Sequence, residues 1–204
     1  SIISQVQAFR SAAREICIGN VEAFRDWSHV SDTVEAYLLL AEHGRTAEAY
    51  NVGSGRTNAV LTFLLTAIDL GFANVHSVSA ANGKKKIEMP LNPDRTRFFG
   101  TAFDKTKIDA LMLHRKIHYG LSDGALHVGT DNGTVEVKLD PAKFRRAEVP
   151  ILFADITKLR RLGFRPKHTL QSIIADMLRP AQPVSGANFA PVQPATTENL
   201  ISTH

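Results

Sequence analysis

Apolar residues recur at helical spacing in several separate stretches of the chain. In the first stretch, Ile2, Val6 and Phe9 fall on one side, whereas Gln5 and Arg14 fall elsewhere. Spacing of this kind is typical of amphipathic helices. It predicts helices over residues 1–16, 32–44, 58–70, 105–118, 155–163 and 169–178.

The second of these predicted helices has recognisable end signals. Asp32 followed by Glu35 has the form of a capping box, and Gly44 stands where a left-handed residue ends many helices. We expect the helix to be amphipathic, with an apolar face made of Val34, Tyr37, Leu38 and Ala41.

Alternating apolar and polar positions predict strands in two places. Residues 47–52 alternate as in a short strand, which the turn Gly53-Ser54-Gly55 ends. A hairpin is predicted over residues 126–139, where Asp131-Asn132-Gly133 separates two alternating runs. Helices that alternate with strands and glycine turns indicate the α/β fold class.

Three blocks of sequence carry a more specific signal. They are GNVEAFRDWSHVSDTVEA with YNVGSG (residues 19–36 and 50–55), DPAKFRRAEV (140–149) and FADITKLRRLGFRP (153–166). Together they resemble the extended short-chain dehydrogenase/reductases that act on nucleotide sugars, most closely the C-terminal part of the GDP-mannose 4,6-dehydratases. One departure is Arg146, which stands where the family usually has proline. Proline there fixes a backbone torsion.

The resemblance also implies a domain organisation. Residues 1–71 and 135–179 match the substrate-binding part of the family's α/β fold, and we interpret residues 72–134 as an inserted α+β segment. Residues 180–204 are polar and rich in Ala and Pro, which predicts a flexible tail. In the family the Rossmann half precedes this part, so we expect a chain from which that half has been removed or separated.

The sequence lacks the family's residues for redox chemistry. No glycines are spaced as GxxGxxG or GxGxxG, the turn that lets a pyrophosphate approach a helix N-terminus. The family's Tyr-x-x-x-Lys pair is also missing, because no tyrosine is followed by lysine four residues later. We expect no catalytic residues here, and NADP bound only by a missing half.

The resemblance implies three substrate-binding residues. Arg25 and Arg145 would approach the diphosphate of a nucleotide sugar, and Glu148 would accept hydrogen bonds from the ribose hydroxyls. A guanidinium matches two phosphate oxygens, and a carboxylate accepts from paired hydroxyls. The alternative is structural: Arg25 pairs with Asp26 or Asp32, and Glu148 pairs with a neighbouring lysine.

Other polar clusters favour structural interpretations. Asp26, His29 and Asp32 lie where a connection to a helix needs its turn amides satisfied. His114 and His118 are four residues apart on a predicted helix, but two imidazoles beside basic residues do not make a metal site. The basic segment 72–134 could contact nucleic acid or lipid headgroups, yet a protein partner is an equally good interpretation.

Bulk properties agree with a globular chain. The 204 residues include 44% hydrophobic residues and carry a formal net charge of +4, which permits contact with phosphates without requiring it. The single cysteine, Cys17, favours a buried thiol in reducing surroundings, the cytoplasm or an organelle interior. No apolar stretch is long enough to predict a membrane span, and no secretory signal is recognisable.

Two functions remain open from the sequence. The chain is either the nucleotide-sugar-binding portion of a GDP-mannose 4,6-dehydratase-like enzyme or a catalytically inactive structural subunit built on that fold. The first needs a companion chain that carries the Rossmann half, and the second needs other subunits of an assembly. In both cases we expect a partner to cover a strand edge and an apolar face.

Overall fold

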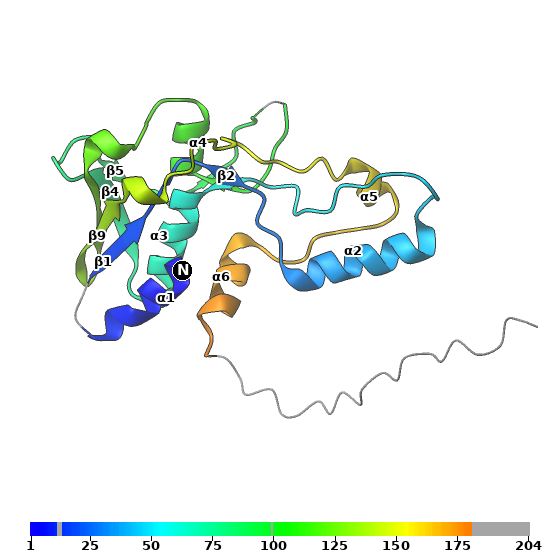
Figure 1. The fold of residues 1–204 in the computed structure, drawn as a ribbon, viewed down its shortest axis with the longest axis horizontal. Helices are drawn as coiled ribbons and strands as arrows, with labels where there is room; N and C mark the ends of the chain where they lie inside the picture. Colours follow the sequence, from blue (N-terminus) through cyan, green and yellow to red (C-terminus); the bar gives the residue numbers. More distant parts are fainter. Residues whose placement is uncertain (12–13, 99, 181–204) are drawn as a thin grey trace, which may run out of the picture.

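The computed structural model describes residues 1–11, 14–98 and 100–180, and Figure 1 shows their arrangement. The predicted tail, apart from Pro180, lies outside the described residues. The sheet and the helices α1 and α3 occupy one end of the molecule, whereas α2 and α5 lie toward the other end (Figure 1).

A five-stranded sheet has the order β1-β9-β8-β4-β5. The β1 and β9 strands pair in parallel, and the remaining neighbours pair antiparallel. The strands are β1 (Glu15–Ile18), β4 (Val75–Ala80), β5 (Ile87–Glu88), β8 (Ala125–Thr130) and β9 (Gly133–Leu139). Two-stranded pairs join β2 (Phe24–Arg25) to β3 (Asn58–Ala59) and β6 (Pro93–Asp94) to β7 (Lys105–Thr106).

Helices cover the sheet and extend away from it. They are α1 (Ile2–Gln7), α2 (Val30–His43), α3 (Val60–Gly71), α4 (Lys107–Leu113), α5 (Thr157–Arg161) and α6 (Leu170–Leu178). Single 3₁₀ turns span Ala8–Ser11, Leu121–Asp123 and Pro141–Lys143. Helix α3 contacts both α1 and α6, so these three helices form one layer.

The main hydrophobic core lies between the sheet and α3. Strand residues such as Leu126 and Val137 alternate with more exposed positions and join Leu61, Leu64 and Ile68 of α3. This alternation is the pattern of a sheet with one buried face. A separate small cluster is formed by Ala36, Ile156, Leu159 and Phe164, which attaches α2 to α5.

The structure confirms the α/β fold class and several predicted elements. Strands β8 and β9 form the predicted hairpin, with Thr130 opposite Gly133 across a two-residue connection. Gly133 has a φ of 99°, which favours glycine. Helix α3 ends at Gly71, and α6 begins after Thr169, whose hydroxyl accepts a hydrogen bond from the Ser172 amide at 3.2 Å.

The predicted helix over residues 1–16 is wrong beyond its first turns. Helix α1 ends at Gln7, and Ile16 lies in strand β1 opposite Val137. The β-branched residues Ile16 and Ile18 suit a strand, and a parallel ladder with β9 outweighs the helical spacing. Cys17, predicted to be buried, is partly exposed on this strand.

The predicted ends of the second helix are also wrong. Helix α2 begins at Val30, and the ring of His29 accepts a hydrogen bond from the Ser31 amide as the N-cap. Asp32 is buried inside the helix and accepts from the Lys167 and His168 amides instead. Gly44 has a φ of −67°, so it is not left-handed.

Helix α2 buries a different face from the predicted one. Ala36 is fully buried, because it packs into the small cluster with α5. The predicted apolar residues are largely exposed: Val34 to 49%, Tyr37 to 61% and Leu38 to 65% of their surface. Val30, at 72%, extends the same stripe. We call Val30, Val34, Tyr37 and Leu38 the α2 stripe.

Two further predictions fail for local reasons. Residues 47–52 form no strand, since no other described strand lies beside them and Ala47 has a φ of 63°. Helix α4 ends at Leu113, so His114 and His118 do not share a helical face. Arg115 follows with a φ of 54°, which reverses the chain.

The hydrophobic core joins the segment 72–134 to the rest of the chain. Val78, Ile108 and Leu126 from this segment share a core cluster with Ile16 and Leu64. The division into a substrate-binding part, an insertion and a tail therefore stays a prediction from the family resemblance. In the structure, the segment 72–134 and the rest of the chain share one hydrophobic core.

Asp109 makes the most extensive polar connection in this core. Its carboxylate is fully buried and accepts hydrogen bonds from the Ala59 amide (2.8 Å), the Thr62 hydroxyl (2.6 Å) and the Asn58 side chain (2.8 Å). The Thr106 amide donates at 2.9 Å and completes the α4 capping box. Burial raises the Asp109 pKa, and these donors oppose that rise.

Replacing Asp109 with asparagine tests this connection. In Asp109→Asn an amide NH₂ faces backbone donors, so we expect a loss of about 2–4 kcal/mol in the free energy of unfolding. Urea unfolding followed by circular dichroism measures it. Asp131→Asn, at an exposed aspartate, is the control and should change stability by less than about 0.5 kcal/mol. Equal effects of the two substitutions would contradict the assignment.

Candidate functional site

A cavity of about 600 Å³ lies between the start of β2, the end of α4 and the segment that follows Glu148. Its lining combines apolar side chains with charged ones. The lining residues are Asn20, Glu22, Phe24, Met112, Leu113, Arg115, Ile117, His118, Glu148, Pro150 and Ile151. An apolar lining with a few convergent polar groups is typical of small-molecule sites.

Two of the three predicted site residues lie together at this cavity. Glu148 lines it, and the Arg25 guanidinium forms an ion pair with the Glu148 carboxylate. Arg25 also donates to the carbonyl oxygens of Phe24 (2.7 Å) and Val149 (2.8 Å). Arg25 therefore positions Glu148 and the neighbouring backbone, and the predicted alternative pairs with Asp26, Asp32 or a lysine do not form.

Backbone pairing explains why Arg25 and Glu148 meet. The Phe24 amide donates to the Pro150 carbonyl at 2.7 Å, and the Leu152 amide donates to the Phe24 carbonyl at 3.0 Å. This short parallel contact brings two of the sequence blocks side by side. Arg145 lies outside the cavity: its side chain is exposed, and it has no hydrogen bond or ion pair within the described chain.

Glu22 and His118 form a second charged pair at the cavity. Glu22 accepts a hydrogen bond from the Tyr119 amide at 2.7 Å, and its other oxygen contacts His118 Nδ1 closely. Burial raises the Glu22 pKa above its usual value, and the bonds from Tyr119 and His118 offset this only in part. The cavity thus holds a carboxylate that takes up a proton more readily than an exposed glutamate.

Sequence reasoning missed three lining residues, Glu22, Arg115 and His118. Glu22 lies within the first motif block, whose family form allows an acid at this position, so that signal was available. Arg115 and His118 line the cavity from the segment after α4, where Arg115 has a φ of 54° and the helix has ended. Chemically, the lining can accept from hydroxyl or amine donors through its carboxylates and donate to an anion through Arg115 and His118.

The glycine turn after residue 52 is held by Asp26. The Asp26 carboxylate accepts from the amides of Ser54 (2.7 Å), Gly55 (3.2 Å) and Ala154 (3.4 Å). A Cβ on Gly53 would stand 2.6 Å from the Ala154 Cβ, which explains why glycine is needed there. The structural interpretation of Asp26 is therefore confirmed.

A second cavity of about 650 Å³ lies beside this turn. Arg56 and Arg160 line it together with Asp104 and Asp155. Burial lowers the Arg56 pKa, and the nearby acids oppose that shift. Positive and negative groups balance in this cavity, so it shows no preference for an anion.

One solved structure shares the fold of most of this chain. The solved structure of RMD from Pseudomonas aeruginosa, complexed with NADPH, matches 87% of this chain and 39% of its own, with a TM-score of 0.51 and 16% sequence identity. At this identity the likeness shows the fold alone.

Sequence comparison is more specific. The family described as GDP-mannose 4,6 dehydratase matches residues 1–119, more than half of the chain. A GDP-mannose 4,6 dehydratase of Drosophila melanogaster is 26% identical over 165 residues, which are 79% of this chain and 31% of the relative. A GDP-mannose 4,6-dehydratase of Vibrio cholerae is 26% identical over 163 residues, 79% of this chain and 35% of the relative.

The chain therefore belongs to the GDP-mannose 4,6-dehydratase family, as the motif blocks predicted. It spans about a third of the length of the curated relatives that it matches. Within the described residues, no helix has both the length and the apolar character needed to cross a bilayer.

The raised Glu22 pKa gives a pH-dependent prediction. A carboxyl whose pKa is higher in the folded than in the unfolded state stabilises the fold at low pH, and this contribution is lost as pH rises through the folded pKa. Glu22→Gln removes the titration. The variant should therefore gain stability relative to wild type as pH rises from about 4.5, the ordinary glutamate value.

Thermal unfolding at a series of pH values measures this difference. Glu42→Gln is a matched control, since Glu42 also faces a histidine, His43 at 3.6 Å, but both side chains are largely exposed. The Glu42 variant should follow the wild-type pH profile. A constant difference between Glu22→Gln and wild type at all pH values would refute the prediction.

Proposed function

We propose that this chain is the nucleotide-sugar-binding portion of a GDP-mannose 4,6-dehydratase-like enzyme. In the complete enzyme, GDP-mannose would become GDP-4-keto-6-deoxymannose. A companion chain or missing half would bind NADP and provide the catalytic residues. The observation that carries the proposal is the cavity whose lining holds Glu148 in an ion pair with Arg25.

The cavity supports binding of a nucleoside diphosphate sugar in three ways. Phe24 and Ile151 offer an apolar surface for a flat base. Glu148 is held by Arg25 where it can accept from the ribose hydroxyls. Arg25 and Arg145 are the proposed diphosphate contacts, and Arg145 is free to turn because its side chain is exposed.

The α2 stripe supports a companion. Its four apolar residues lie at positions i, i+4, i+7 and i+8 of one helix and form a continuous apolar face. Beside the end of α2, residues 48–52 have the composition of a strand but no strand neighbour within the described chain. A companion chain could pair a strand with residues 48–52 and cover the apolar α2 stripe.

NADP is proposed for the companion rather than for this chain. The related RMD structure contains NADPH, and that chain is more than twice as long as the part matched here. This chain has no glycine-rich phosphate turn in its sequence. In this proposal the present chain binds the nucleotide sugar, and the other half binds the hydride cofactor.

A structural subunit is the second candidate. Arg145 lies outside the cavity, and Arg25 already uses its guanidinium to hold Glu148, Phe24 and Val149. Because Arg25 is already paired within the protein, it favours the interpretation that this chain kept the fold of the family and lost ligand binding. The α2 stripe would then pack against other subunits of an assembly.

GDP binding distinguishes the two candidates. We expect the full chain to bind GDP and Glu148→Gln to weaken that binding at least tenfold, because a charged acceptor for the ribose hydroxyls is lost; tenfold corresponds to about 1.4 kcal/mol. Isothermal titration calorimetry measures the affinities. Glu136→Gln, a carboxylate on β9 outside the cavity, should bind GDP as wild type does.

Two results would count against the nucleotide-sugar proposal. One is a wild-type chain that binds no GDP, either alone or with its co-purifying partners. The other is equal GDP affinity in Glu148→Gln and wild type. Either result would leave the structural subunit as the better explanation.

The α2 stripe also predicts the behaviour of the isolated chain. Exposed apolar area of this extent favours association in water, so we expect oligomers in native mass spectrometry. Tyr37→Ser with Leu38→Ser should shift the distribution toward monomer. Leu70→Ser, at another exposed leucine outside the stripe, is the control. A stable wild-type monomer would contradict the need for a partner.

A further inference from the structure

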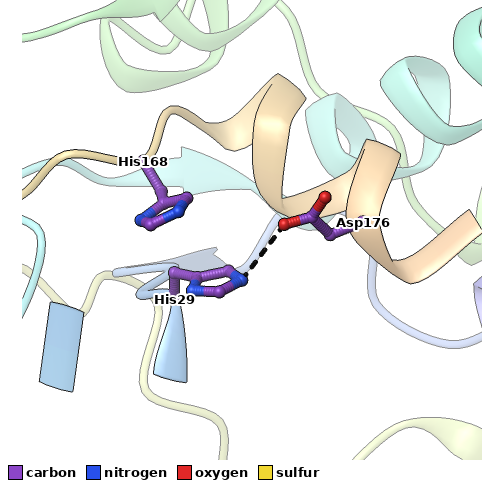
Figure 2. Close-up of side chains that lie close together, drawn as sticks. All are labelled: His29, His168 and Asp176. Atoms are coloured by element: carbon purple, nitrogen blue, oxygen red, sulfur yellow. Dashed lines mark ion pairs between the residues drawn. The ribbon is translucent and has the colours of Figure 1, made fainter. Parts of the chain in front are cut away.

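Two histidines and an aspartate from three separate elements converge near the start of α2. His29 is the N-cap of α2, His168 precedes α6, and Asp176 lies in the last turns of α6. One possible ligand atom from each residue lies within 4.8 Å of the other two. Figure 2 shows the His29 ring directed at Asp176, with the His168 ring above it. We call these residues the His–His–Asp cluster.

The spacing of His29 and Asp176 already suits a shared ion. His29 Nε2 and Asp176 Oδ2 are 3.3 Å apart (Figure 2). Two donor atoms bound to one zinc ion at about 2.0 Å with a tetrahedral angle lie roughly 3.3 Å apart. The other Asp176 oxygen is held by Arg179 at 2.9 Å, which leaves Oδ2 directed at the histidine.

Asp32 favours the His168 tautomer that a metal needs. His168 Nδ1 lies 2.9 Å from the buried Asp32 carboxylate. A carboxylate is a common second partner of a metal-binding imidazole, and at this distance it favours the proton on Nδ1 and the lone pair on Nε2.

His29 has a corresponding partner. Its Nδ1 is 2.6 Å from the Ser31 hydroxyl, which can accept a hydrogen bond from the N–H that Nδ1 must carry when Nε2 binds a metal. The Ser31 amide then loses Nδ1 as its acceptor. Without metal, Nδ1 accepts from the Ser31 amide and Nε2–H points at Asp176. Ligation thus moves a proton between the two ring nitrogens of His29 and releases none from it.

We propose that the His–His–Asp cluster binds one Zn²⁺ ion through His29, His168 and Asp176, with water as the fourth ligand. Two imidazoles and a carboxylate are ligands that zinc prefers, and partial exposure of all three leaves a path for the ion. The ion connects the start of α2 to the end of α6, and so fixes the helix that carries the α2 stripe.

Binding requires one change in the rings. The His29 and His168 rings are stacked, with centroids 3.9 Å apart and 17° between their planes. Zinc binds along in-plane lone pairs, so parallel rings do not converge on one ion. The His168 ring must turn about its Cβ–Cγ bond, a torsion with broad minima, and this turn gives up the hydrogen bond between Nδ1 and Asp32. Binding therefore exchanges ring stacking and that hydrogen bond for a bond to zinc.

Zinc titration of the full chain, first stripped with a chelator, tests the proposal. Isothermal titration calorimetry should give one Zn²⁺ per chain. His168→Gln and Asp176→Asn should each weaken binding at least tenfold, and zinc should raise the unfolding temperature of wild type more than that of either variant. The control His43→Gln removes a histidine beside Glu42 at the other end of α2 and should match wild type.

A second readout guards against variants that do not fold. Asp176→Asn keeps the size of the side chain and lies outside the core, so its metal-free circular dichroism should match wild type. If it does, its zinc affinity alone decides the matter. A wild-type chain without stoichiometric Zn²⁺ binding, or binding that survives both substitutions, would overturn the proposal.

Discussion

The buried carboxylate of Asp109 is the interaction on which the rest of the described structure depends. It ties the first turn of α4 to β3 and to the start of α3, and so joins the segment 72–134 to the preceding part of the chain. A buried carboxylate is costly unless donors surround it. Here five donor contacts offset that cost and hold α4 against β3 and α3.

The cavity is built from contacts between distant parts of the chain. Glu22 contacts His118, and the short backbone contact at Phe24 places Glu148 beside Arg25. Helix α2 extends to the far end, where the small cluster around Ala36 and the hydrogen bonds of Asp32 attach it. One side of the chain thus forms a pocket, and another leaves an apolar face for a partner.

The sequence correctly predicted elements that depend mainly on contacts between residues close in the chain. The hairpin β8–β9, helix α3 and helix α6 each follow from periodicity with turn or capping residues in place. The motif blocks also identified the family. The substrate-binding roles of Arg25, Arg145 and Glu148 stay a prediction. These results needed no knowledge of distant contacts.

The failures have long-range causes. Strand β1 exists because β9, more than a hundred residues later, pairs with it. Asp32 lies inside α2 because the amides of Lys167 and His168 need an acceptor. Residues 47–52 have the composition of a strand, but they form none in the described chain, where Ala47 has a φ of 63°. Periodicity alone cannot reveal which partner an element has.

The most direct test is to purify the native particle that contains this chain and to identify its chains and its nucleotides by mass spectrometry. Our account predicts a stoichiometric companion with a glycine-rich dinucleotide turn, together with bound NADP. A particle that contains neither such a companion nor NADP would contradict it.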